Sequence, residues 1–414
     1  MGLFRRTKNN NQPVISQILS LIPVWILASV VKTHKSDKFC HRYLTRDELV
    51  ALMFGQLNKC STLQDISTGI AVSETFIKDL GLKQSPARST MSDGNKKRSW
   101  QVFESLYFKL LNHYRVVLEK KHRSHEIKEI EGKTVKIIDS TLINLCLAMF
   151  DWAKYRTAKG GIKIHTCWDE SIMLPDMVNI TEGKVSDRYG LAKMVFPKGT
   201  IIIEDRGYFD FSLMKHRIKS DNHFVTRIKC NTVFEKVKEL PIDKSQNPNL
   251  FSDWIIRLNG DAAVDAGMHE EELRLVQVYD EEKDLMIDII TNNLEWSAAT
   301  VAALYKLRWA IELFFKALKQ NLQVKSFLGT SQNAVKSQIY VALITYLLLE
   351  LIRRTVCKTH QAFSNFCEKI RICLTYYQTL DYVCNIVKQG AHAVRKKAVP
   401  HESLLTSQPD LFSG

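Results

Sequence analysis

Residues 135–141 read VKIIDST, an apolar and β-branched run that ends in an acid and two hydroxyl residues. A run of this length and composition, bounded by polar residues, predicts a strand buried inside a sheet. A second run, TIIIED at 200–205, has the same form and also ends in an acid. Open α/β sheets bind ligands at the carboxyl ends of their strands, so Asp139 and Asp205 are the first candidates for a functional site.

Two acids at strand ends carry more weight than one. A lone aspartate in this position is usually a solvated strand end, whereas two in one sheet are expected to converge. Converging carboxylates repel each other unless a cation lies between them, because each charge disfavours the ionisation of the other. The pair therefore predicts a site for a divalent metal with oxygen ligands.

Short runs on either side extend this sheet. Strands are predicted at 161–168 and 223–229, and a helix at 187–195 precedes the strand that ends in Asp205. Strands that alternate with helices predict a mixed α/β sheet. Residues 230–296 add further strand-like segments (DWIIRLN, LRLVQVYD and LMIDIIT) separated by Gly, Asn, Asp and Pro, which predicts an all-β insertion.

The N-terminal part of the chain has helical periodicity instead. After a basic tail at 1–12, apolar residues recur three and four positions apart over 13–125, which predicts a helical domain. Its most apolar stretch, 14–31, has 18 residues and a proline within it. A membrane-spanning helix needs about 20 nearly unbroken apolar residues, so we expect a core helix or helix pair here, and no membrane partner.

A basic helix is predicted near the end of this region. Pro86 and the serines beside it favour a helix start, and the segment 87–98 that follows is rich in Lys and Arg. The arrangement is similar to a helix-turn-helix module with 87–98 as its reading helix, although many small helical domains share the pattern. The expected DNA contacts are Arg88, Lys96, Lys97 and Arg98.

Charge and cysteine usage bound the partner and the compartment. The chain has 58 Lys and Arg against 44 Asp and Glu, a formal net charge of +14, which points to a polyanion, nucleic acid before an anionic membrane. Nine cysteines are scattered without a CxxC pair. The odd count and the spacing argue against a disulfide framework and for a reducing, cytoplasmic location.

The chain is helical again after residue 297, apart from a possible strand at 323–328, and 351–414 is expected to be a C-terminal helical region. The helix predicted at 304–322 gathers its apolar residues on one side, at 100° per residue. Four polar side chains lie beside that face within about 60° of one another: Tyr305, Arg308, Glu312 and Lys319. Taken alone, this stripe would be a solvated face with ion pairs four residues apart.

The spacing of these four residues resembles the Y-x2-R-x3-E-x6-K signature of a large family of bacterial insertion-sequence transposases, the IS-four type. Asp139 in IIDST and Asp205 in DRGYFD match the first two acids of that family, and Glu312 matches the third. The segments 34–57, 85–98 and 158–166 also look like this family, so the resemblance extends from about residue 13 to 350.

The resemblance implies a DDE-class enzyme whose ribonuclease-H-like core spans 132–350, with a β insertion at 230–296. Asp139, Asp205 and Glu312 would hold two Mg²⁺ ions about 4 Å apart, and Mn²⁺ should substitute. Tyr305, Arg308 and Lys319 would grip phosphates beside the cut. The expected partners are the terminal inverted repeats, target DNA and a second copy of the chain, with the protein on the nucleoid when it is bound to DNA.

Two other functions fit parts of the pattern. A non-catalytic DNA-binding regulator derived from a transposase predicts the loss of at least one acid, yet all three are present. A plain metal-dependent nuclease would not need the polar stripe. The family is also thought to stack a flipped base on an aromatic side chain of the β insertion. The last predicted strand of the insertion, 285–291, contains no aromatic residue, so Trp254 and Trp296 are the nearby candidates. The expectation of a hairpin intermediate is therefore weaker than that of the metal chemistry.

Overall fold

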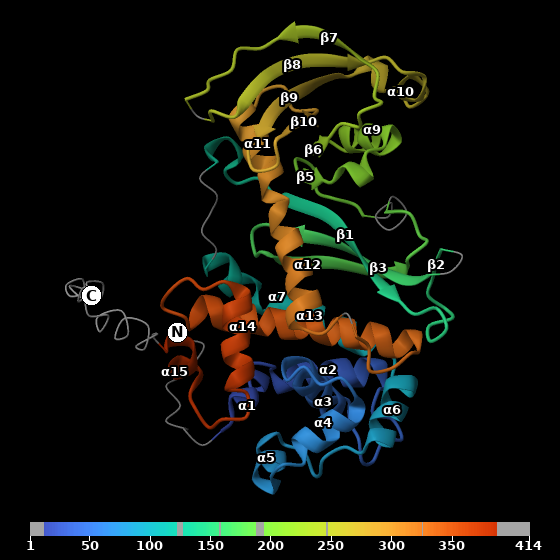
Figure 1. The fold of residues 1–414 in the computed structure, drawn as a ribbon, viewed down its shortest axis with the longest axis vertical. Helices are drawn as coiled ribbons and strands as arrows, with labels where there is room; N and C mark the ends of the chain where they lie inside the picture. Colours follow the sequence, from blue (N-terminus) through green and yellow to red (C-terminus); the bar gives the residue numbers. More distant parts are fainter. Residues whose placement is uncertain are drawn as a thin grey trace, which may run out of the picture.

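The computed structural model describes residues 12–121, 127–156, 159–187, 194–245, 247–324 and 326–386. The molecule is elongated, with a helical body at one end and a large sheet at the other (Figure 1). Helices α11 (Ala298–Leu307) and α12 (Trp309–Asn321) run along the long axis and connect the two parts.

One mixed sheet of ten strands carries Asp139 on β1, and Asp205 directly follows β5. Its order is β2-β3-β1-β5-β6-β10-β9-β8-β7, with β4 paired to β3. Strands β1, β5 and β6 are parallel, and the other pairings are antiparallel. The strands are β1 (Val135–Leu145), β2 (Lys154–Arg156), β3 (Lys159–Asp169), β4 (Leu174–Glu182), β5 (Ile201–Glu204), β6 (His223–Arg227), β7 (Phe234–Glu239), β8 (Leu250–Leu258), β9 (Glu272–Asp280) and β10 (Leu285–Thr291).

The segment predicted as an all-β insertion is part of this same sheet. Strand β10 pairs with β6, so β7 to β10 continue the sheet rather than forming a separate one. The pairing gives β6 a partner for backbone groups that an edge strand would leave exposed. The segment is also not purely β, because it contains helix α10 (Asp261–Asp265) and a 3₁₀ turn at Met268–Glu270.

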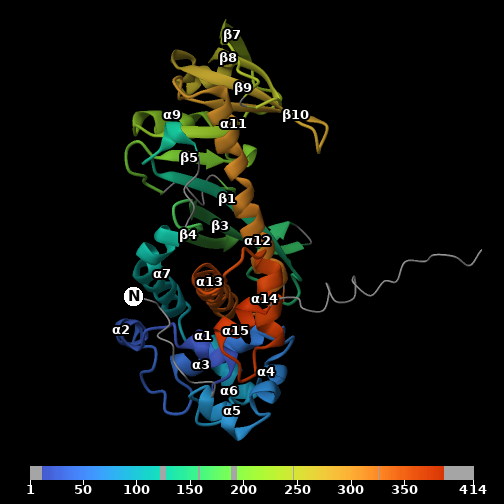
Figure 2. The same cartoon turned by 90° about the vertical axis from the view of Figure 1, so that its left-hand side faces the viewer.

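The helical body is built from both ends of the chain (Figure 2). Its long helix α13 is buried between the N-terminal helices and packs on α7, α3 and α6. The side chain of Gln56 on α3 donates to the carbonyl of Gln338 on α13 at 2.7 Å. The helices are α1 (Val14–Leu19), α2 (Val24–His34), α3 (Thr45–Leu57), α4 (Leu63–Ile70), α5 (Glu74–Asp79), α6 (Arg88–Lys97), α7 (Gln101–Lys121), α13 (Gln332–Thr355), α14 (Phe363–Ile372) and α15 (Leu380–Asn385).

The helices on the two sides of the chain's catalytic segment pack together. Those before residue 125 share one hydrophobic core with α13 and α14, and the domain limits at 125 and 351 stay predictions. Helix α13 has the length and hydropathy of a membrane-spanning helix, but 94% of its most apolar window is buried by the rest of the protein. The apolar stretch at 14–31 is the expected helix pair, with Pro23 between α1 and α2.

Two local predictions had other outcomes. The possible strand at 323–328 is wrong, because the described residues of that segment form a loop. Its backbone groups bond to a side chain instead of a neighbouring strand: Gln338 accepts from the N–H of Leu328 at 2.9 Å and donates to the carbonyl of Ser326 at 2.8 Å. The helix predicted at 187–195 lies mostly outside the described residues, as does the tail predicted at 1–12.

Candidate active site

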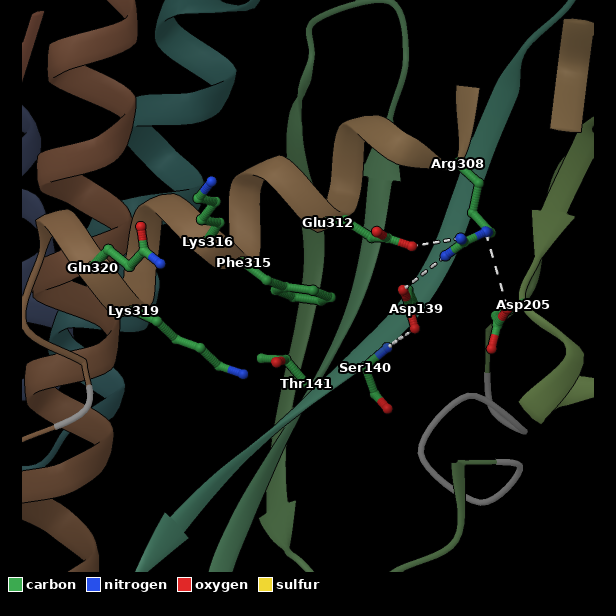
Figure 3. A pocket seen from close by; sticks show the side chains of 10 residues that line it. All are labelled: Asp139, Ser140, Thr141, Asp205, Arg308, Glu312, Phe315, Lys316, Lys319 and Gln320. Carbon is green, nitrogen blue, oxygen red and sulfur yellow. Dashed lines mark hydrogen bonds and ion pairs between the residues drawn. The ribbon is translucent and has the colours of Figure 1, made fainter. Parts of the chain in front are cut away.

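The sheet places the two aspartates side by side. In the parallel pair β1–β5, Ile138 is in register with Glu204, so the next residue on each strand is one of the two acids. Strand β5 ends there, while β1 continues past Asp139 and pairs with β3. Helix α12 packs on β1 and adds Glu312 from its first turn. Figure 3 shows the three carboxylates pointing toward one another from β1, the end of β5 and α12.

A guanidinium group lies between the three acids. The Arg308 side chain is 3.6 Å from Asp139 (Nη1 to Oδ2) and 4.0 Å from Asp205 (Nε to Oδ1). It also forms a close ion pair with Glu312 (Nη2 to Oε1). Its Nε is buried without a hydrogen-bond partner, since 4.0 Å to Asp205 is too long for one. Arg308 therefore offsets part of the negative charge of the cluster, and its own Nε donor stays without a hydrogen bond.

These groups open onto a pocket of about 500 Å³ whose rim is basic. Lys316 and Lys319 follow Glu312 on α12 and also line the pocket; Figure 3 shows Lys319 extending toward Thr141 and Lys316 directed away from the acids. The pocket thus combines acids that could bind a metal with lysines that could bind the backbone of a polyanion. The lining residues are Asp139, Ser140, Thr141, Asp205, Arg308, Glu312, Phe315, Lys316, Lys319 and Gln320.

The donor set fits a hard divalent cation, although the described carboxylates do not converge closely enough to form a ready metal cage. All three candidate ligands are carboxylates, which is the chemistry that Mg²⁺ prefers. The pKa of Asp139 is raised to about 7, mainly by burial and also by the negative charges of Asp205 and Glu312, against the opposing effects of the Ser140 N–H and Arg308. The charged form of Asp139 is thus disfavoured in the metal-free protein, and a bound cation would stabilise it.

This shift predicts a pH-dependent metal affinity. Below about pH 7 a proton must leave Asp139 before a cation can bind, so the affinity should be roughly tenfold lower at pH 6 than at pH 8. Calorimetric titration with Mn²⁺ at the two pH values checks this. An affinity that does not change between pH 6 and 8 would contradict it.

The same shift has a definite sign for stability. The folded pKa of Asp139, about 7, lies above its ordinary value of 3.8. The folded state therefore binds more protons between these values, and stability falls as the pH rises from about 4 to 7. Metal-free Asp139→Asn should lack this decrease, which urea titrations at pH 5 and 8 would measure.

The polar stripe is realised, but on two helices. The predicted single helix at 304–322 is interrupted at Arg308, which ends α11 and precedes α12. Glu312 then lies in the first turn of α12, where the positive helix end favours a carboxylate. Tyr305 is only 8% exposed and lies under the guanidinium, with 5.7 Å between its ring centroid and Cζ of Arg308. It supports Arg308 and does not line the pocket.

A fourth acid, Asp187, borders the site and was missed by the sequence analysis. Its Oδ1 accepts from the Ser140 hydroxyl at 2.6 Å and lies 3.2 Å from Nζ of Lys163. The Ser140 N–H in turn donates to Asp139 at 2.7 Å. His165 is 3.8 Å away, and burial lowers its pKa to about 4, so Lys163 is the charged partner. In the sequence, Lys163 and His165 of the AKGGIKIHT segment were the residues that could have pointed to an acidic partner at this place.

The predicted reading helix needs one correction. Arg88, Lys96 and Lys97 are exposed on α6, as DNA contacts would have to be. Arg98 is 5% exposed and forms a buried ion pair with Glu48, so it is not available to DNA. It follows the last residue of α6, where the chain turns inward toward α3.

The two tryptophans proposed for a flipped base are both engaged. Trp296 is 7% exposed and packs edge-on against His223, with 5.1 Å between the ring centroids. Trp254 is partly buried, and Nζ of Lys236 lies 4.2 Å from its ring centroid. Trp296 is thus a core residue.

Comparison with known proteins agrees with this geometry. Residues 130–348, more than half of the chain, match the transposase DDE domain, and residues 10–83 match a domain of unknown function, DUF4372. The first match begins just before β1 and extends into α13, so it contains all three acids.

Several transposases are similar to this chain. It is 30% identical over 275 residues to a putative transposase, y4zB, of Sinorhizobium fredii, covering 65% of this chain and 72% of the relative. It is 29% identical over 222 residues to a probable transposase for insertion sequence element IS5377 of Geobacillus stearothermophilus, covering 52% and 56%. A putative transposase for element IS4SA of Synechocystis is 27% identical over 270 residues, covering 64% and 71%.

Among solved structures, the piggyBac transposase in a synaptic complex with hairpin DNA aligns over 97% of this chain and 88% of its own, with 12% identity and a TM-score of 0.40. The family assignment depends on the sequence matches and not on this alignment. On those matches, the chain belongs to the transposase DDE domain family.

Proposed function

We propose that this protein is a catalytically active transposase of the IS-four type. It binds the terminal inverted repeats of an insertion sequence, cuts the DNA and joins the freed ends to a target, with Mg²⁺ or Mn²⁺ as cofactor. The observation that carries the proposal is the meeting of Asp139, Asp205 and Glu312, from three separate segments, in one basic-rimmed pocket. A regulator that only binds DNA would have no use for such a centre.

We propose further that the core is ribonuclease-H-like. The strand order β4-β3-β1-β5-β6 supports this, because three antiparallel strands are followed by two that are parallel to β1. In this arrangement β1 is central and its acid lies beside the end of β5. Burial of all four residues of β5 is expected for a strand inside a doubly covered sheet.

The side chains would divide the work as follows. Asp139, Asp205 and Glu312 hold the metal, which when bound activates the attacking hydroxyl and stabilises the leaving oxygen. Arg308 offsets part of the negative charge of these carboxylates. The planar guanidinium would suit bidentate contact with a phosphate of the bound strand. Lys319 at the rim adds a point charge that orients the strand.

The test of this proposal is excision. The full chain is incubated with a plasmid that carries the two inverted repeats flanking its gene, with Mg²⁺ and with EDTA. A released element and a broken donor backbone, in Mg²⁺ only, are expected. Specific binding of the repeats without any cleavage in Mg²⁺ or Mn²⁺ would favour the regulator. Synapsis of two ends requires two copies, so cleavage of paired ends should accompany a dimeric complex.

The DNA-binding role of α6 predicts a separate loss. Arg88, Lys96 and Lys97 are exposed on one short helix, so replacing all three by Gln should weaken repeat binding and lower the slope of log K against log salt by up to about 2.7. Lys83→Gln, an exposed charge outside α6, is the matched control. An unchanged slope in a folded triple variant would remove α6 from the interface.

A further inference from the structure

The loop between α2 and α3, residues 35–44 (KSDKFCHRYL), combines exposed positive charge with an exposed aromatic ring. Lys35, Lys38, His41 and Arg42 all have exposed side chains. Between them Phe39 is 83% exposed, and Nζ of Lys38 lies 4.8 Å from its ring centroid. The loop thus presents one large apolar ring beside the ammonium group of Lys38 and within a run of exposed cations.

The backbone holds Phe39 outward against its own preference. Its φ is +63°, in the left-handed region that bulky residues avoid. Lys35 also has a positive φ, of 50°, but as the residue that ends α2 it is an ordinary left-handed helix cap. Phe39 is the third residue of a hydrogen-bonded turn in which the Cys40 N–H donates to the Asp37 carbonyl at 3.0 Å, a position with positive φ that glycine or asparagine usually occupies. Non-glycine residues held in this region are characteristic of sites where the surrounding structure imposes a functional conformation.

Side chains on the inner side of the loop hold its backbone in this conformation. Asp37, the only acid in the loop, accepts from both the N–H and the hydroxyl of Thr45 at 2.7 Å. Arg98 lies 3.6 Å from Asp37 and donates to the carbonyl of Tyr43 at 2.8 Å, while it is ion-paired with Glu48. The acid of the loop is thus turned inward, and the cations remain on the outside.

The same anchor connects the loop to α6. Arg98 directly follows that helix. Gly94 on α6 packs so closely on Tyr43 that a Cβ there would lie 2.8 Å from the ring. The loop and α6 therefore pack directly against each other in the helical body. Buried Arg98 thus holds the loop in place, whereas the sequence predicted that it contacts DNA directly.

We propose that the loop 35–44 is a second DNA-contacting element, in which Phe39 inserts against a base step of the transposon end and Lys35, Lys38 and Arg42 bind the flanking phosphates. Apolar side chains that enter a base step partly unstack it, and cations around them neutralise the backbone. Duplex DNA fits this charge pattern better than a protein partner, because every exposed charge in the loop is positive. The inference depends on the DNA binding that is part of the proposed function.

The test measures binding of the full chain to a terminal-repeat duplex in EDTA, so that cleavage plays no part. Phe39→Ala should weaken binding about tenfold or more with an unchanged salt slope, and Phe39→Trp should restore it. Lys35, Lys38 and Arg42 changed together to Gln should lower the slope by about 2.7. With 2-aminopurine placed at successive steps of the duplex, fluorescence should rise at one step with wild type and not with Phe39→Ala.

Val72→Ala is the matched control, since Val72 is 80% exposed elsewhere on the helical body. Thermal unfolding should be the same for all variants, because each changed side chain is on the surface. If Phe39→Ala binds the duplex as tightly as Val72→Ala, the inference is overturned. A change in oligomeric state with unchanged DNA affinity would overturn it as well, in favour of a protein partner. If wild type itself shows no preference for the repeat duplex, the proposed function is what fails.

Discussion

Replacing Asp139, Asp205 or Glu312 by Ala is expected to reduce DNA cleavage by at least about 1000-fold, while binding of the repeat duplex stays within about twofold. Loss of a carboxylate removes a ligand from the proposed metal site, and charge stabilisation by such metals is worth several kcal/mol, of which about 4 kcal/mol corresponds to 1000-fold. DNA affinity should persist because the cations of the pocket rim and of α6 are untouched. Excision assays and binding isotherms on the same preparations measure both quantities.

Asp265→Ala is the control for these variants, since Asp265 is an exposed acid far along the sheet on α10. It should cleave like the wild type. Near-normal excision by any one of the three pocket variants would remove that residue from the metal site. Equal loss of binding and cleavage would point instead to misfolding, which thermal unfolding would reveal.

Arg308→Ala and Lys319→Ala are expected to stall the reaction after the first nick. A nick needs only water and a bound duplex, whereas the later steps must hold a freed 3′-hydroxyl against a second phosphate. Loss of a phosphate contact sacrifices that orientation, and a displacement of about 1 Å can cost roughly 100-fold in rate. Nicked but unreleased ends should therefore accumulate, as denaturing gels of end-labelled DNA would show.

The position of Arg308 adds a second expectation that separates it from Lys319. The guanidinium lies among all three carboxylates, so its removal should leave metal affinity intact or raise it several-fold. Lys306→Ala, an exposed lysine on α11, is the matched control. Loss of the nick itself, as complete as in Glu312→Ala, would contradict a clamp and favour a role in assembling the active complex. Normal rates at every step would make the stripe a solvated face.

Local sequence patterns determined most of the elements. The apolar runs at 135–141 and 200–205 form β1 and β5 because short β-branched runs favour buried strands wherever they lie in the chain. The apolar face of α12 is buried as its 100° periodicity predicts, with Ile311, Phe314 and Leu318 at most 1% exposed. Strand β4 was missed, since its sequence LPDMVNITE has no clear alternation and forms a strand through its pairing with β3.

The sequence by itself also determined which residues are candidates for the site, because strand ends and helix spacing are local properties. Only the tertiary structure decided which of them meet and what state they are in. Burial of Asp139, and hence its raised pKa, comes from α12 packing across β1. Arg98 is buried in an ion pair with Glu48, 50 positions earlier in the chain, and is therefore not exposed to bind DNA. Contacts between residues so far apart in the sequence produce no periodic pattern in it, since each partner alone is an ordinary charged residue.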